Sequence, residues 1–352
     1  MRCFCIFAVS AAASLCHAVD NYTMTDLGLM GGSFSMHTGG TTGVASCGVF
    51  DSGGSNHGFV WTTSGIQDVG TLGGAWSAAY GVIGAGHSVG QSETASGEFH
   101  AFYNNTFSMT DLSFLGANSA AFGINNALHI VGQHTSGGQN RAFLATTSAL
   151  ITDLGFGESD DNALAINSVG NVVGYGTTGG VNHAWFWNGS LQDIGTLVAG
   201  GTSAARGISS NNYVTGVAQG VSGQDNGFVW DGTTMSALLP LTGDVTSGSY
   251  SVNNFAQCVG YSIDSSSNQH GALWESGVGY DINSLIVGPT GGLNVIEGRG
   301  INGFHGIYAT ARDANGAYHA VILNATTVPE PTSLAVLGFG VLALGRRRKQ
   351  SK

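Results

Sequence analysis

The sequence repeats itself at a nearly constant period, and this period limits the folds that it can adopt. An Asp followed by a hydrophobic residue recurs every 40 to 44 residues, with Ala in its place in one copy. Its positions are Asp26, Asp68, Asp111, Asp153, Asp193, Ala237 and Asp281. A second marker, usually a glycine, stands nine residues before another small residue. These pairs are Gly39/Gly48, Gly81/Gly90, Gly123/Gly132, Ala165/Gly174, Gly207/Gly216, Ser251/Gly260 and Gly300/Ala309. Seven copies with constant internal spacing indicate a tandem repeat.

Each copy predicts four short strands. They are a small-residue strand ending in Ile-Asn, a Val-Val-Gly strand, a His-Ala-Phe strand and a strand ending in Asp-Leu-Gly. Residues 181–195 show the last two as a hairpin around Asn188-Gly189, a dipeptide that favours the two positive-φ positions of a type I′ turn. Four antiparallel strands in about 42 residues match one β-propeller blade. A solenoid, whose coils are usually shorter, is the alternative.

The phase of the repeat predicts a closed ring. The first Asp-Leu-Gly strand, residues 22–28, has no partner in its own copy, and the last His-Ala-Val strand, residues 318–323, lacks a following one. Pairing the two removes a free sheet edge. We therefore expect an all-β, seven-bladed β-propeller of four-stranded antiparallel blades, closed by the N-terminal strand. Its small-residue strands should lie innermost, and its aromatic strands should fill the widening space further out.

Charge excludes one class of partner. The 352-residue chain has 10 basic and 21 acidic residues and a net charge of −11. Residues 19–327 contain no lysine, four arginines and twenty carboxylates. Such a body repels phosphate backbones, so a nucleic-acid partner is not expected.

The amino end predicts export. Arg2 precedes an apolar run over residues 3–15, and small residues stand at positions −3 and −1 of a cleavage site after Ala18. These are the parts of a secretory signal peptide over residues 1–18, with a buried helix as the alternative. Cys47 and Cys258 remain after cleavage. The ring model separates them by a blade, so we expect two buried small hydrophobic side chains and no disulfide.

Two motifs that suggest catalysis or nucleotide binding coincide with ordinary repeat strands. Residues 86–90 match GxSxG around Ser88, and residues 298–303 match GxGxxG, but neither is placed at a strand–turn–helix junction. We expect no catalytic residue here.

The recurrent histidines stand once per blade, at His57, His100, His183, His270 and His319. Their wide spacing is not that of metal ligands, so no metal and no cofactor is expected. Hydrogen bonding to the neighbouring Asp-bearing strand is the expected role, and each Asp should accept backbone N–H groups in the turn that follows it.

If a small ligand binds, the propeller geometry points to the central mouth. The candidate ligand-binding residues are Asn125, Asn167, Ser209, Asn253 and Asn302. The alternative is that these side chains cap the inner strands.

The carboxyl end carries three successive signals. Pro329-Glu330-Pro331 is followed by an apolar stretch over residues 333–345 and by the basic run Arg346, Arg347, Arg348 and Lys349. The apolar stretch is short beside the ~20 residues of a stable span, and the basic residues favour the cytoplasmic side. Residues 328–352 resemble the PEP-CTERM sorting signal. This resemblance implies recognition at Pro329-Glu330-Pro331 by an exosortase, transient anchoring in the membrane by a hydrophobic helix, and removal of that helix.

The repeats resemble the HAF family of extracellular repeats over residues 26–323, on His100-Ala101-Phe102 and, altered, His183-Ala184-Trp185. Arg141, Asn226 and Ala237 depart from its pattern, and the resemblance brings no catalytic residue. The expected protein is a secreted, non-enzymatic structural or adhesive component of the cell envelope, extracellular matrix or biofilm that contacts exopolysaccharide.

Two other functions stay open. One is an enzyme acting on glycans or lactones, for which the carboxylates outside the repeat positions are Glu98, Glu158, Asp160 and Asp161. The other is ice binding, for which Thr41-Thr42 and Thr177-Thr178 are only isolated pairs.

Overall fold

The computed structural model describes residues 19–326, apart from 31, 34, 41–44, 117, 148–150 and 156–158. In these residues the chain forms strands and two short 3-10 helices, η1 (Ser113–Leu115) and η2 (Ile282–Leu285). No helix within them is long and apolar enough to cross a membrane. The predicted signal peptide, the sorting signal and its hydrophobic helix lie outside the described residues.

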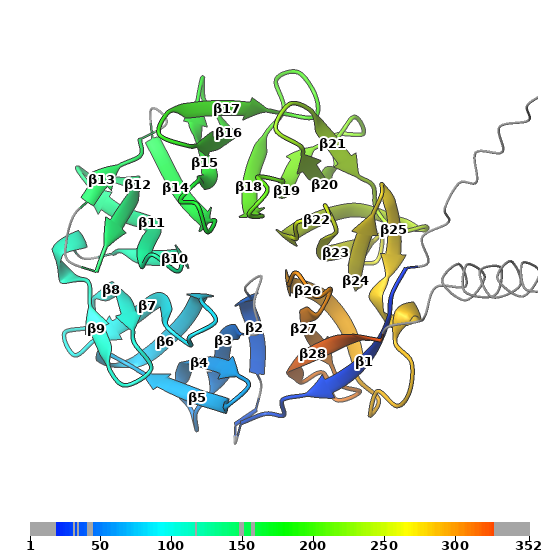
Figure 1. Cartoon of the computed structure of the whole chain (residues 1–352), viewed down its shortest axis with the longest axis horizontal. Coiled ribbons are helices and arrows are strands. Elements are labelled where there is room, and N and C mark those ends of the chain that lie inside the picture. The colour runs from blue at the N-terminus through cyan, green and yellow to red at the C-terminus, as the bar shows by residue number, and fades with distance from the viewer. Residues whose placement is uncertain are drawn as a thin grey trace, which may run out of the picture.

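The strands form four-stranded antiparallel units arranged around a centre (Figure 1). The first three units are β2 (Ser35–Gly40), β3 (Ser46–Asp51), β4 (Asn56–Thr62) and β5 (Gly65–Gly70); β6 (Gly73–Val82), β7 (Ser88–Thr94), β8 (Phe99–Asn104) and β9 (Met109–Asp111); and β10 (Ala120–Ile124), β11 (His129–Ser136), β12 (Gln139–Thr146) and β13 (Ile151–Asp153). A single parallel pair, Asn56 with Trp76, joins the first two units into one larger sheet.

Three further units follow the same order from the centre outward. They are β14 (Ser159–Ile166), β15 (Val172–Thr178), β16 (Val181–Trp187) and β17 (Leu191–Gly195); β18 (Ser203–Ile208), β19 (Val214–Gln219), β20 (Asp225–Trp230) and β21 (Met235–Leu238); and β22 (Asp244–Val252), β23 (Cys258–Asp264), β24 (Gln269–Glu275) and β25 (Val278–Asp281). The predicted all-β architecture of four-stranded antiparallel sheets is confirmed.

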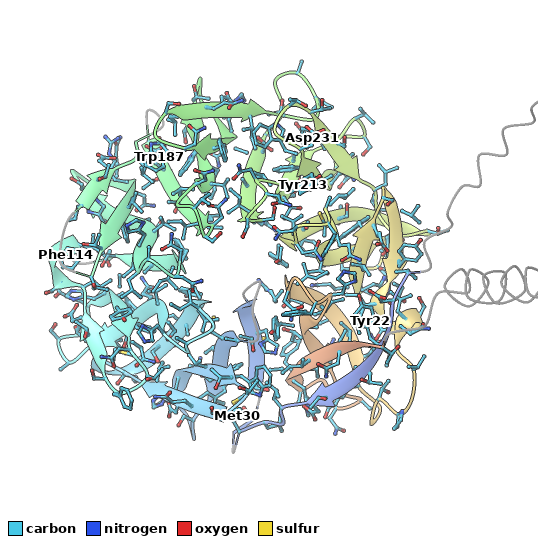
Figure 2. All side chains as sticks on the ribbon, in the orientation of Figure 1. Tyr22, Met30, Phe114, Trp187, Tyr213 and Asp231 are labelled. Carbon is cyan, nitrogen blue, oxygen red and sulfur yellow. The ribbon has the colours of Figure 1, made fainter. Side chains whose placement is uncertain are left out.

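The last unit takes its outer strand from the other end of the chain. It consists of β26 (Asn294–Ile301), β27 (Ile307–Arg312), β28 (Tyr318–Thr326) and β1 (Asn21–Asp26). β1 pairs antiparallel with β28 from Asn21 opposite Thr326 to Asp26 opposite Val321. The predicted closure is therefore confirmed, and this unit is the seventh in the described residues. Tyr22, labelled in Figure 2, is fully buried in the apolar cluster that β1 shares with the last two units.

The core lies between neighbouring units. One cluster combines Val89 and Tyr103 of the second unit with Ile130 and Phe143 of the third. Another combines Phe186 of the fourth unit with Trp230 of the fifth. The rings of Phe186 and Trp230 are 5.5 Å apart. Both faces of a unit are therefore packed, which explains why the third strand does not alternate between apolar and polar residues.

A close approach of backbones explains the glycine that six of the seven second strands carry, with Ala309 in the remaining one. At Gly90 of β7, an added Cβ would overlap the carbonyl oxygen of Ala78 on the inner strand and lie 2.8 Å from the ring of Phe102. The side chain of Phe102 is fully buried. A glycine here lets the inner strand and the aromatic strand pack tightly against β7.

Gly90→Ala should therefore lower the free energy of unfolding by about 2 kcal/mol, the usual cost of overpacking a core. Gly84→Ala is the matched control, because Gly84 is exposed and no atom lies within 4 Å of its added Cβ. Chemical denaturation of the two variants checks this. Equal stabilities would contradict the packing argument.

The hairpin at Asn188-Gly189 is confirmed, but its predicted turn type is wrong. Trp187 pairs with Leu191, so the loop has three residues, not two. Gly189 has a φ of 103°, whereas Asn188 is not in the positive-φ region. Instead, the Asn188 Oδ1 accepts a hydrogen bond from the N–H of Ser190 at 3.4 Å. The extra residue removes the need for a second left-handed position.

The two cysteines behave as small apolar side chains. Cys47 and Cys258 are both buried and are not joined by a disulfide. Burial raises the pKa of the Cys258 thiol to about 12. This thiol therefore stays protonated, and the prediction of two buried side chains is confirmed.

His37 of β2 replaces the small residue that other inner strands place at this position, such as Ala79 and Ala121. It is almost fully buried, and its ring lies 5.8 Å from that of Tyr308 in the last unit. Burial lowers its pKa from 6.5 to about 4. Between these values the unfolded chain binds a proton that the folded chain excludes, so stability falls as the pH drops through this window.

We expect His37→Ala to remove about 3 kcal/mol of this pH dependence between pH 7 and pH 4. Thermal unfolding of the variant and the wild type at several pH values measures the difference. His134→Ala, at a half-buried histidine of β11, serves as the control. Parallel curves for His37→Ala and the wild type would show that His37 does not couple to folding.

Candidate functional site

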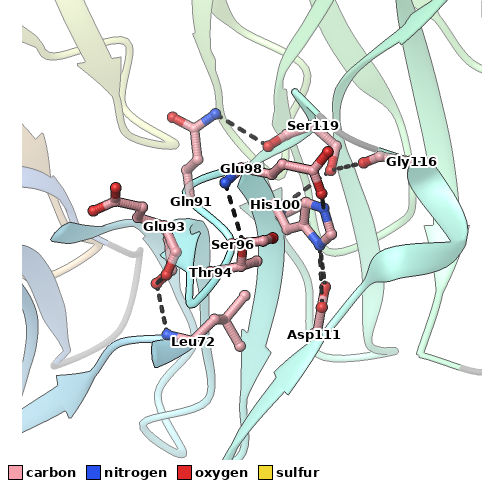
Figure 3. A network of polar contacts seen from close by, with 12 residues as sticks. Leu72, Gln91, Glu93, Thr94, Ser96, Glu98, His100, Asp111, Gly116 and Ser119 are labelled. Atoms are coloured by element: carbon pink, nitrogen blue, oxygen red, sulfur yellow. Dashed lines mark hydrogen bonds and ion pairs between the residues drawn. The ribbon is translucent and has the colours of Figure 1, made fainter. Parts of the chain in front are cut away.

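The recurrent histidines pair with the recurrent aspartates across the two outer strands. Nδ1 of His57, His100, His183 and His319 lies 2.8 to 3.1 Å from the carboxylates of Asp68, Asp111, Asp193 and Asp26, respectively. Figure 3 shows the pair formed by His100 and Asp111. The predicted hydrogen bond to the neighbouring Asp-bearing strand is confirmed for these four. The pairs stand on separate blades and do not converge on a common site.

His270 is an exception. Its Nδ1 lies 3.0 Å from Oδ2 of the nearly buried Asp244 on β22, and this hydrogen bond raises the pKa of His270. The expected partner, Asp281, instead accepts the N–H of Asn283 at 2.8 Å and caps η2. A helical turn after β25 therefore takes the carboxylate that would otherwise meet the histidine.

The aspartates also hold the turns that follow their strands. Oδ1 of Asp26, Asp68, Asp153 and Asp193 accepts the N–H two residues later at 2.7 to 2.8 Å. This confirms the second predicted role. Three of the four His–Asp pairs, those of Asp26, Asp68 and Asp193, thus also fix a turn on the outer side of the ring.

Buried serines join neighbouring blades, which the sequence reasoning missed. Ser119 accepts the N–H of Ala101 from the preceding blade at 3.0 Å and donates to the carbonyl of Gly116 (Figure 3). Ser35, Ser77, Ser203 and Ser247 make the same two bonds. The signal was present, because each of these serines stands four residues before the repeat glycine or serine of its inner strand.

The five polar residues predicted for the mouth are buried at the ends of the inner strands. Oδ1 of Asn167 accepts the N–H groups of Val169 and Asn171 at 3.2 and 2.9 Å, and Nδ2 donates to the carbonyl of Ser209 at 3.0 Å. Asn125, Asn253 and Asn302 accept turn N–H groups in the same way. Asn125 and Asn167 also line the central cavity, whereas Ser209, Asn253 and Asn302 do not. Their proposed contact with a ligand stays a prediction.

Asn167→Ala should lower the free energy of unfolding by about 2 kcal/mol, because it leaves part-buried N–H groups and the Ser209 carbonyl without a partner. Asn126→Ala, at an exposed residue of the preceding turn, is the control. Denaturant melts of both variants provide the measurement. An unchanged midpoint for Asn167→Ala would contradict the role of this amide as a link between blades.

A β-bulge in every inner strand places one residue per blade at the centre. The pairing of the inner strand with the second strand skips one residue just before the repeat glycine or its equivalent. Such an extra residue is unpaired and its side chain is redirected. The skipped residues are Thr38, Tyr80, Phe122, Leu164, Arg206, Tyr250 and Arg299. The side chain of Thr38 is outside the described part of the chain.

The other six skipped residues line a central cavity of about 640 Å³. Tyr80 and Phe122 form one wall, with ring centroids 5.5 Å apart. Opposite them, the guanidinium of Arg299 lies 4.0 Å and that of Arg206 5.1 Å from the ring centroid of Tyr250. These are cation–π distances. The channel therefore has an apolar aromatic side and a cationic side.

The two arginines are not equivalent. Nε of Arg299 donates to Oε1 of the buried Glu297 at 2.8 Å, which neutralises this guanidinium. Nη1 of Arg206 is buried and has no hydrogen-bond partner among the described residues. Burial raises the pKa of Tyr250, so the phenol between the two arginines stays neutral. Arg206 is thus the uncompensated charge of the channel.

Carboxylates are missing from the described lining of this cavity. Asp161 lies on the inner strand β14 but is fully buried and faces Arg141 at 3.9 Å. Glu98 and the exposed Asp160 do not line the cavity, and Glu158 is outside the described residues. No group of three or more His, Cys, Asp or Glu side chains that could hold a metal occurs in the part of the chain that the structure describes.

Exposed apolar side chains lie at the end of the channel where the capping asparagines stand. The turns that follow the capping asparagines expose Val169, Phe255 and Phe304, which are 69%, 63% and 76% accessible. Large apolar residues at this exposure around one end of a channel are typical of an interaction surface.

Solved structures resemble the chain in fold. The β-propeller domain of the Trilobed protease from Pyrococcus furiosus is 9% identical, covering 85% of this chain and 98% of its own, with a TM-score of 0.53. Virginiamycin B lyase from Staphylococcus aureus is 10% identical, covering 87% of this chain and 100% of its own, with a TM-score of 0.51. At these identities the likeness establishes the propeller fold alone.

No curated protein matches the chain in sequence. One family model does match: residues 327–349 fit the PEP-CTERM protein-sorting motif. The predicted sorting signal is therefore confirmed, and it indicates sorting to the cell surface through an exosortase.

Proposed function

We propose that this protein is an exported, non-enzymatic adhesive component of the cell envelope or extracellular matrix, and that its propeller contacts exopolysaccharide. The observation that carries the proposal is the sorting motif at residues 327–349, which directs a preceding domain to the cell surface. The domain in question is the ring of blades. Its repeats resemble the HAF type of extracellular repeat, which agrees with the same destination.

The geometry of the ring supports binding rather than chemistry. The four His–Asp pairs stand on separate blades, and Ser88 is buried in the strand β7. The central channel, by contrast, combines aromatic rings with guanidinium groups. Aromatic walls with a few polar groups are typical of ligand sites, and exposed apolar turns next to them extend the surface available to a long polymer.

The test follows the protein from the membrane to the matrix. The intact mass of the protein recovered outside the cells should end near Pro329, and this protein should be retained on native exopolysaccharide. Changing Pro329, Glu330 and Pro331 together to Ala should leave the uncleaved chain with the cells. Pro289→Ala, at an exposed proline in the body, is the control and should be processed normally.

Two outcomes would count against the proposal. Release of the triple variant with the wild-type mass would contradict sorting through the motif. Normal processing without retention on the polysaccharide would remove the adhesive part while leaving the destination intact.

A further inference from the structure

We propose that the central channel binds an acidic sugar, a uronate residue, with Arg206 contacting its carboxylate and with Tyr80 and Phe122 contacting its ring. This inference deepens the proposed function and rests on it in taking the sugar from a surface polysaccharide. The bulged residues that line the channel carry it.

The cationic side of the channel provides the charge selectivity. The chain is strongly acidic, with a net charge of −11, yet two of the four arginines of its body meet in this cavity. Glu297 compensates Arg299, whereas Nη1 of Arg206 has no hydrogen-bond partner in the described residues. The guanidinium of Arg206 lines the cavity, and it matches a carboxylate in charge and in planar geometry.

Placement against Tyr250 keeps the guanidinium groups in position. Arg206 and Arg299 come from the blades before and after that of Tyr250 and both lie against this ring, and the ring of Tyr261 is 5.4 Å from it. Stacked and partly buried, Arg206 loses less side-chain freedom on binding an anion than a lysine would. The site is therefore organised before the ligand arrives.

The opposite wall favours a ring-shaped ligand over a simple anion. Tyr80 and Phe122 present an apolar surface across the cavity from Arg206, and Leu164 adds apolar surface on the blade next to that of Arg206. The C–H face of a sugar can lie against such a surface while its hydroxyl groups reach Asn126, Ser168 or Ser210 at the mouth. A cavity of about 640 Å³ lies in the size range of small-molecule sites and accommodates a saccharide unit.

The experiment is isothermal titration calorimetry of the exported protein with glucuronate, glucose and acetate. Glucuronate should bind with one site per chain, and both glucose and acetate should bind at least about tenfold more weakly, because each lacks one of the two contacts. Glucuronate binding should weaken as the salt concentration rises. Equal binding of glucose, or equal binding of acetate, would overturn the proposal.

The variants separate the channel from the overall charge. Arg206→Gln should reduce glucuronate affinity at least about tenfold. Arg312→Gln removes the same charge from the strand β27, where Arg312 lies over Tyr318 away from the channel, and should have no effect. Leu164→Glu, which adds a carboxylate to the lumen, should abolish binding even if Arg206→Gln unfolds the protein. Equal losses in Arg206→Gln and Arg312→Gln, or full binding by Leu164→Glu, would overturn the proposal.

The channel and the adhesive function can fail separately. Retention on exopolysaccharide without glucuronate binding would remove the channel site and leave the proposed function. Binding of glucuronate without retention on exopolysaccharide would remove the adhesive function and leave the channel site.

Discussion

The pairing of β1 with β28 is the contact on which the ring depends. Each of the other described blades consists of strands that follow one another in sequence, so each can form locally. The last blade instead joins Asn21–Asp26 to a strand some 300 residues later, and closing so long a loop has an entropic cost. Ser35 extends the closure by accepting the N–H of Ala320, so the first and last blades meet through the same serine bond as most other neighbours.

The positions within a blade are of two kinds, which differ in how tightly the neighbouring side chains and backbone constrain them. The second-strand glycines, the linking serines and the aromatic rings pack against fixed neighbours. The glycine recurs in six of the seven blades, and the serine and the aromatic ring each recur in five. The bulged residue of each inner strand has no partner across the ladder, and the six whose side chains are described line the cavity. Tyr, Phe, Leu and Arg all occur there, which is why the channel has two chemically different sides although the scaffold is uniform.

Much of the fold could be predicted because the repeat is regular. The constant offset of nine residues is the length of a tight inner hairpin, and the unmatched strands at the two ends indicated the closure. The channel residues could not be found in this way. A bulge shifts the register by one residue, and the alternation of a regular strand gives no sign of it. The asparagines are conspicuous in the sequence and suggest ligand contacts, but their amide groups already bind turns and the next blade. At Asn188-Gly189, the loop has one residue more than a type I′ turn, and the dipeptide alone does not show how long the loop is.

The bulged position also lets the chemistry of the channel change without a change of scaffold. A substitution there alters one segment of the lumen and leaves the ladder pairing and the interblade serine links in place, and it changes only contacts among lumen side chains, such as that of Tyr80 with Phe122. Related chains can therefore keep the same ring of blades while exchanging lumen side chains one at a time. In such a design the scaffold is conserved by packing, and recognition evolves almost independently of stability.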